Sequence, residues 1–168
     1  MKLRLIPVLA AAACCLVFPL SVCAADSSTE ISYVQENTPS FNVTIPAALS
    51  LSKEGTALDI TASDVADLGS KRISVTIAGT DYYRNQMVLS GVTSAPSFSK
   101  TVRYQLIAAD GTIYETTGTD TMSGTELASF TDNGTTTYTA KPVTEGAVNI
   151  ENGVDYTGTL EFGISLTD

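Results

Sequence analysis

Near its end the chain reads YTGTLEFGISL, residues 156–166, and this stretch decides the fold class. One set of alternate positions holds Tyr, Gly, Leu, Phe, Ile and Leu, and the other holds Thr, Thr, Glu, Gly and Ser. Successive side chains of a β-strand point to opposite faces, so this period of two puts one face on a core and the other in water. The stretch is therefore predicted to be a half-buried β-strand.

The same alternation recurs earlier, at residues 41–45, 73–77, 87–92 and 102–106. Turn signals separate these stretches. Asp110-Gly111 predicts a hairpin with a type I′ turn, and similar turn chemistry recurs at residues 132–134 and 151–153. Eight to ten short strands with this spacing predict an all-β, antiparallel β-sandwich rather than a parallel sheet covered by helices.

The predicted core consists of the apolar positions of these strands, and other stretches are expected to connect them. Residues 49–52 are expected to resume the strand that Pro46 interrupts, and Gly91 is expected to mark a bulge or bend. Residues 63–69 are the one helix-like stretch, at most one or two turns long, and residues 116–125 are predicted to form a surface loop. The core list is Phe41, Val43, Ile45, Leu49, Leu51, Ile73, Val75, Ile77, Leu89, Val102, Tyr104, Leu106, Leu160, Phe162 and Ile164.

The N-terminus has the pattern of a secretory signal peptide. Lys2 and Arg4 precede an apolar stretch, and small residues at 22–24 predict cleavage between Ala24 and Ala25. The apolar stretch is short for a membrane anchor, which needs about 20 residues. A second alternative is lipidation of Cys23, because residues 20–23 loosely resemble a lipobox, although Val22 departs from it. We therefore expect a secreted or extracellular chain, either free or associated with the cell wall, with no membrane span in its mature form.

Removal of residues 1–24 changes both charge and cysteine content. It takes away two of the nine basic residues and leaves all 18 acidic ones, so the mature chain is strongly acidic. Such a charge disfavours nucleic acid as a partner. All three cysteines (Cys14, Cys15 and Cys23) lie in the signal, so the mature chain has no disulfide. We expect residues 25–39 to be a polar leader or edge strand and residues 40–168 to be the β-sandwich domain.

The leader contains one short apolar stretch, residues 31–35, whose pairing the sequence leaves open. It can complete its own sandwich, or it can add to a neighbour's open edge and so mediate self-association. The short link through residues 37–39 to Phe41 favours pairing within the same chain.

Both ends of the predicted domain resemble one family. The stretch FNVTIPA, residues 41–47, resembles the opening of small secreted surface domains of Gram-positive, clostridia-type bacteria, and residues 155–162 resemble their final strand. The final strand is also similar to those of pilin-like and WxL-type sandwiches. The resemblance implies an Ig-like or pilin-like surface protein with structural or adhesive work. The chain departs from it in having no Trp, and therefore no WxL motif, and in ending without a sorting signal.

The residue types available limit the chemistry. The chain has no His, which removes Ser-His-Asp and Cys-His catalysis, and without His or mature Cys the usual zinc and haem sites are also missing. A glycosidase would need two carboxylates across a groove, yet no motif singles out Glu115, Glu126, Glu145, Glu151 or Glu161. We therefore predict no enzymatic activity and no cofactor. A structural calcium at Asp110, Asp120 or residues 132–134 is the remaining metal hypothesis, although these are first of all turn residues.

A sugar-binding sandwich usually displays aromatic rings, and one cluster has that character. Tyr82 and Tyr83 are adjacent and are followed by Arg84, which makes these three the candidate ligand-binding residues. The alternative without a ligand is one buried and one half-buried Tyr at a strand start. We therefore predict a structural, adhesive or assembly subunit of the bacterial surface, whose partners are surface proteins, glycans or copies of itself. The second hypothesis is a carbohydrate-binding module around Tyr82 and Tyr83.

Overall fold

The computed structural model describes residues 30–35, 38–92, 99–146 and 150–168. The chain divides into two units, residues 1–35 and residues 36–168, and each is described by itself. In the first unit, residues 30–35 belong to no helix or strand and have exposed side chains. The predicted signal peptide, its cleavage site between Ala24 and Ala25, and Cys23 lie outside the described residues.

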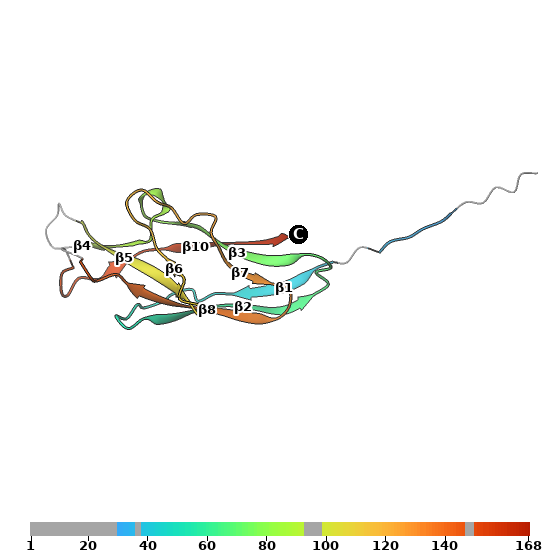
Figure 1. Ribbon diagram of the computed structural model, residues 1–168, viewed down its shortest axis with the longest axis horizontal. Coiled ribbons are helices and arrows are strands. Elements are labelled where there is room, and N and C mark those ends of the chain that lie inside the picture. Colours follow the sequence, from blue (N-terminus) through green and yellow to red (C-terminus); the bar gives the residue numbers. More distant parts are fainter. Residues whose placement is uncertain (1–29, 36–37, 93–98, 147–149) are drawn as a thin grey trace, which may run out of the picture. The chain divides into compact units, whose positions relative to one another are not determined.

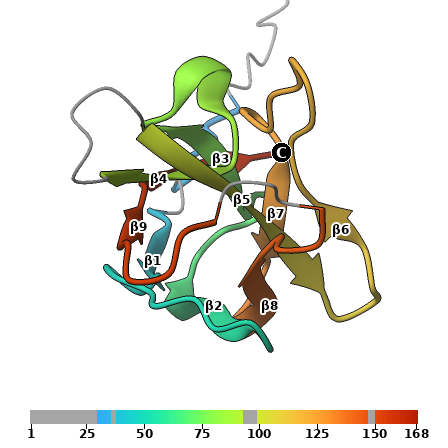
Figure 2. The same cartoon turned by 90° about the vertical axis from the view of Figure 1, so that its left-hand side faces the viewer.

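The second unit is built almost wholly of β-strands, ten of them in the described part of the chain (Figure 1). They form a larger sheet in the order β1-β2-β8-β5-β4-β9, with β6 paired to β5, and a smaller sheet in the order β10-β3-β7. Every pairing is antiparallel, and the larger sheet curves when it is viewed end-on (Figure 2). The strands are β1 (Ser40–Thr44), β2 (Thr56–Ala66), β3 (Arg72–Thr80), β4 (Val88–Val92), β5 (Ser99–Ala108), β6 (Ile113–Tyr114), β7 (Glu126–Phe130), β8 (Gly134–Pro142), β9 (Tyr156–Thr157) and β10 (Leu160–Thr167). The prediction of an all-β antiparallel sandwich is confirmed.

Residues 63–69 form no helix, so that prediction is wrong. Residues 63–66 continue β2, where Ser63 pairs with Asn42 of β1. Asp64 has a positive φ of 54° and accepts a hydrogen bond from the Asn42 side chain at 2.7 Å. Pairing with β1 therefore outweighs the weak helix preference of a stretch this short.

The core lies between the two sheets and contains most of the predicted residues. Ile73, Val75 and Ile77 of β3 are fully buried. The predicted residues of β1, of the 49–51 segment and of the start of β10 are only partly buried against this core. Ile164 was predicted to be core but is 45% exposed, so its placement was wrong. Residues 49–52 form no strand, which also differs from the prediction.

The sequence predicted special roles for Gly111 and Gly91, and the structure agrees only in part. The Asp110-Gly111 hairpin is present and joins β5 to β6, but only Gly111 has a positive φ, of 87°. The Gly111 amide donates a 2.9 Å hydrogen bond to the Ala108 carbonyl, so the central residues are Ala109 and Asp110. Neither has a positive φ, and the turn is therefore not type I′, which requires positive φ at both central residues. Gly91 marks no bulge, because β4 stays in register there; instead, a Cβ at Gly91 would lie 2.6 Å from Val154 Cγ1 and 2.9 Å from the Tyr156 ring. Close packing of the chain around β9 therefore requires glycine at this position.

Candidate functional site

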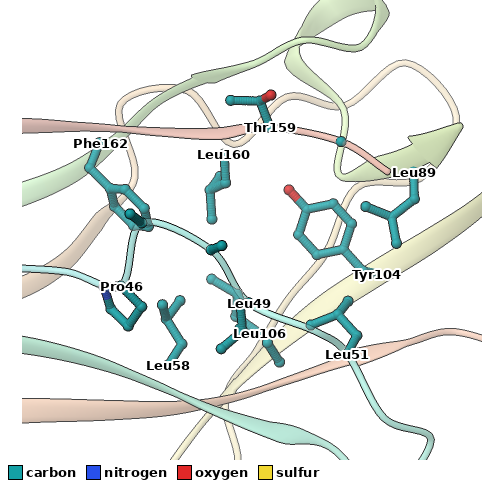
Figure 3. Close-up of a pocket in the computed structure, with 14 residues that line it drawn as sticks. Pro46, Leu49, Leu51, Leu58, Leu89, Tyr104, Leu106, Thr159, Leu160 and Phe162 are labelled. Atoms are coloured by element: carbon teal, nitrogen blue, oxygen red, sulfur yellow. The ribbon is translucent and has the colours of Figure 1, made fainter. Parts of the chain in front are cut away.

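An apolar groove of about 230 Å³ lies between the two sheets (Figure 3). One wall is formed by β10, from which Leu160 and Phe162 project, and the opposite wall by β2 and β5, which contribute Leu58 and Leu106. The segment 46–51 passes along the groove and adds Leu49 and other apolar side chains. The groove thus has walls from both sheets and belongs to the interior of the sandwich rather than to one surface loop.

The groove exists because the chain leaves the larger sheet at Pro46. Proline has no backbone N–H and so cannot continue a strand ladder as a donor. The β1–β2 pairing accordingly stops at Thr44 and Thr61, and the first half of β2 pairs only with β8. The Thr56 hydroxyl donates a 2.8 Å hydrogen bond to the Ser50 carbonyl and ties the end of the diverging segment back to β2.

Tyr104 and Thr159 are the polar side chains that line this groove. Tyr104 is only 6% exposed, and Figure 3 shows its hydroxyl directed toward the segment that carries Thr159 and Leu160. Among the described residues this hydroxyl has no hydrogen-bond partner. Burial raises the pKa of Tyr104 to about 12, and the charge of Asp81 adds to the effect. The hydroxyl therefore remains protonated at neutral pH, as a donor facing a mainly apolar space.

A second, wider hollow of about 640 Å³ adjoins the groove. The two share Leu49, Leu51 and Leu89, so they form one continuous depression along the segment 46–51. The wider part reaches β9 and is bordered by one basic and one acidic residue, Lys53 and Asp155. Its size and continuity suit an extended chain segment better than a compact ion or polar ligand.

The edge of β10 lies beside this groove and is open. In the described part of the chain β10 pairs only with β3, over eight register positions. Ile164 stands opposite Val75 of β3, and directly paired residues in a sheet point to the same face. Val75 is completely buried, whereas Ile164 is 45% exposed. The inward face of β10 is therefore incompletely covered along its free edge.

The predicted aromatic cluster lies in a turn and not at a strand start. Tyr83 and Arg84 belong to the 3-10 turn η1 (Tyr83–Asn85), and Tyr82 precedes it. Tyr83 is 71% exposed, Tyr82 is half-buried, and the Arg84 guanidinium carbon lies 5.3 Å from the centre of the Tyr83 ring. The turn brings together the three residues that the sequence singled out, but it displays only one ring.

The turn that carries Tyr83 has an unusual backbone conformation. Arg84 and Asn85 both have positive φ, 58° and 54°, in a region that non-glycine residues seldom adopt. The Asn85 side chain accepts a hydrogen bond from the Thr80 amide at 3.3 Å, and the Thr80 hydroxyl donates to the Gln86 carbonyl at 2.8 Å. These bonds hold the turn against β3 and fix the direction of Tyr83.

The candidate calcium residues serve their own turns. Asp110 accepts a hydrogen bond from the Thr112 amide at 2.9 Å, which lowers the pKa of that carboxyl. Asp120 accepts one from the Thr117 hydroxyl at 2.9 Å, and Asp132 accepts one from the following amide at 2.7 Å. Over the described ranges, no three His, Cys, Asp or Glu residues form a group that could hold a metal ion.

Glu126, one of the glutamates considered for a glycosidase, has a perturbed carboxyl. A hydrogen bond from the Ser74 hydroxyl, and then one from Arg72, lowers the pKa of Glu126. Arg72 Nη1 lies 2.8 Å from Glu126 Oε2. A carboxylate held in its ionised form by such partners is a poor general acid, and this cluster reads as a surface ion pair.

No protein-family model, curated protein or solved structure matches the chain. No helix in the described part is long and apolar enough to cross a membrane. The sequence had named Tyr104 and the Leu160 strand as core, but it missed the groove between them. The available signal was Pro46. It predicted that the first strand would be interrupted, but it did not predict the groove beside the diverging segment.

Proposed function

We propose that this chain is a secreted, non-enzymatic assembly subunit of the bacterial cell surface, which associates with further copies of itself through its leader. The observation that carries the proposal is the leader's exposed apolar stretch. Ile31, Tyr33 and Val34 are 82–90% exposed, more than any other large apolar side chain in the described part of the chain. Neighbouring large apolar side chains left in water favour association with another surface.

Two further observations support this function. The N-terminal pattern is that of an exported chain, and the lack of His and of mature Cys leaves few catalytic groups. The sequence favours pairing of the leader within its own chain; we propose the alternative that it leaves open, pairing between chains, because the leader exposes large apolar side chains.

The test is the association state of residues 25–168, measured by sedimentation velocity over a wide concentration range. We expect oligomers whose population rises with concentration. A variant with Ile31, Tyr33 and Val34 all changed to Ser should be monomeric, with an unchanged thermal melt. A matched variant carrying Ser32→Ala and Gln35→Ala should associate as the unaltered chain does. A chain that stays monomeric at every concentration contradicts the proposal.

The display of Tyr83 favours a second candidate function, carbohydrate binding. A single exposed ring with an adjacent guanidinium can stack on a sugar face and donate hydrogen bonds to its hydroxyls. A glycan array with the purified chain, repeated with Tyr83→Ala and with the half-buried control Tyr82→Phe, separates the two functions. Binding that is lost only with Tyr83→Ala supports this candidate.

A further inference from the structure

β10 has the features of an acceptor for one more strand. It is the longest edge strand of the described part, with eight residues, and its free edge carries unpaired backbone groups. Such an edge is a template for pairing with another chain. Natural sheets usually protect long edges with inward-pointing charges, prolines or bulges. β10 has a register shift between Glu161 and Phe162, but residues 162–166 beyond it carry no charge, proline or further bulge.

The side chains of β10 show on which face the additional strand is missing. Ile164 points to the same face as the buried Val75, and the next inward residue, Leu166, pairs with the buried Ile73. Ile164 is nevertheless 45% exposed, and Leu166 is only half-buried. A strand with apolar residues at alternate positions, added beside β10, would cover this face.

The groove supplies a place for a large side chain of that strand. Its volume of about 230 Å³ exceeds the roughly 150 Å³ of a cavity known to hold benzene, so it can hold an aromatic ring. Tyr104 is a buried residue whose hydroxyl faces into the groove and has no acceptor among the described residues. The missing occupant therefore combines apolar side chains with a carbonyl or hydroxyl oxygen, as a peptide strand does.

We infer that the free edge of β10, with the groove beneath it, receives the leader of a second copy of this chain as an added strand. The inference rests on the proposed function and names its acceptor site. Ile31 and Tyr33 are two residues apart and would share the inward face of an extended strand. Six extended residues, 30–35, span about 20 Å and fit along the eight residues of β10, about 27 Å. Tyr33 or Ile31 enters the groove, and Tyr104 donates to an oxygen of the incoming segment.

The test uses one defective donor and one defective acceptor in the chain 25–168. Tyr33→Lys disables the leader, and Ile164→Lys places a charge on the inward face of the β10 edge. Ser32→Lys and Ser165→Lys are the controls, because each adds the same charge at the next position, on the opposite face. We expect each test variant to weaken self-association about tenfold or more and the controls to leave it near the unaltered value.

Mixing the two test variants gives the decisive result. The Tyr33→Lys chain keeps an intact acceptor and the Ile164→Lys chain keeps an intact leader, so the mixture should form 1:1 dimers and nothing larger. If Ile164→Lys associates normally while Tyr33→Lys does not, the assembly function stands and the β10 site is wrong. If the mixture stays monomeric while both controls associate, the site is also wrong. If the unaltered chain never associates, the proposed function itself fails.

Discussion

Two buried tyrosines should respond in opposite directions to the same substitution. The Tyr104 hydroxyl lies in the groove with no acceptor among the described residues, whereas the Tyr138 hydroxyl donates to the Leu127 carbonyl. Tyr138 is 3% exposed, and its ring meets that of Tyr114 edge-on, with 5.7 Å between the ring centres. Substitution by Phe keeps each ring and removes only the hydroxyl, so it isolates the hydrogen bond.

The magnitudes follow from what each hydroxyl does in the folded state. Tyr138→Phe removes a made bond and leaves a buried carbonyl without a donor, which should cost about 1–2 kcal/mol. Tyr104→Phe removes a donor that lacks a protein acceptor. Because the groove is partly open to water, the gain in stability should be small, between 0 and about 1 kcal/mol. For a domain of this size, 1 kcal/mol corresponds to about 3 or 4 °C in Tm.

Urea unfolding followed by far-ultraviolet circular dichroism measures both effects. The samples carry Tyr33→Lys, which we expect to keep them monomeric, so that association does not add to the measured stability. We expect Tyr138→Phe to unfold at lower urea and Tyr104→Phe at equal or higher urea, with unchanged slopes. A loss for Tyr104→Phe as large as that for Tyr138→Phe would mean that its hydroxyl already has a partner, and would refute the open-donor account of the groove.

Burial, close packing and the cysteine-free mature chain lead to three other predictions. Burial raises the pKa of both buried tyrosines to about 12, so the unfolded chain loses these protons first. Stability should therefore fall as the pH rises from about 10 to 12, by up to roughly 2 kcal/mol per tyrosine, and less in each Phe variant; equal losses in all chains would count against this assignment. Gly91→Ala should destabilise by about 1–3 kcal/mol through its clash with Val154, whereas Gly134→Ala, with no contact under 3.6 Å, should be nearly neutral in the same urea assay. With no cysteine after residue 24, a Tyr33→Cys chain mixed with Ile164→Cys or a neighbouring inward position should form a disulfide-linked dimer on a non-reducing gel, and Ser165→Cys should not.

The sequence predicted the strands well, because burial of one face requires apolar residues at every second position. The stretch 73–77 shows this most clearly: its predicted inward residues are fully buried in β3. The helix predicted at residues 63–69 is absent. Capping residues are a weak signal for a helix when a neighbouring strand can pair with the same backbone. The hairpin at Asp110-Gly111 was found, but its turn type depends on the backbone angle of Asp110, which many residues can satisfy in either form.

The candidate site was harder to predict, because it depends on what is missing beside a strand. Ile164 carries the same pattern as the residues before and after it, and nothing in that pattern tells whether another strand lies alongside. Tyr104 looked like a core residue and is one, but whether its hydroxyl has an acceptor depends on chain segments far away in the sequence. Tyr83 likewise lies beside a residue with positive φ, Arg84, and residue type alone does not indicate that backbone conformation.

The pairing of β3 has a consequence for the order in which this domain can fold. Thr80 at the end of β3 pairs with Leu160, eighty residues later, and Asp59 of β2 pairs with Thr137 of β8. Neither sheet can therefore form from neighbouring segments alone. The entropy cost of closing long loops comes before the stabilising contacts form, so folding is slow, in the range of milliseconds to seconds. While the chain is being synthesised, β3 has no final strand to pair with until almost all residues have emerged. Until β10 is available, one edge of β3 stays unpaired, so this side of the smaller sheet is completed last.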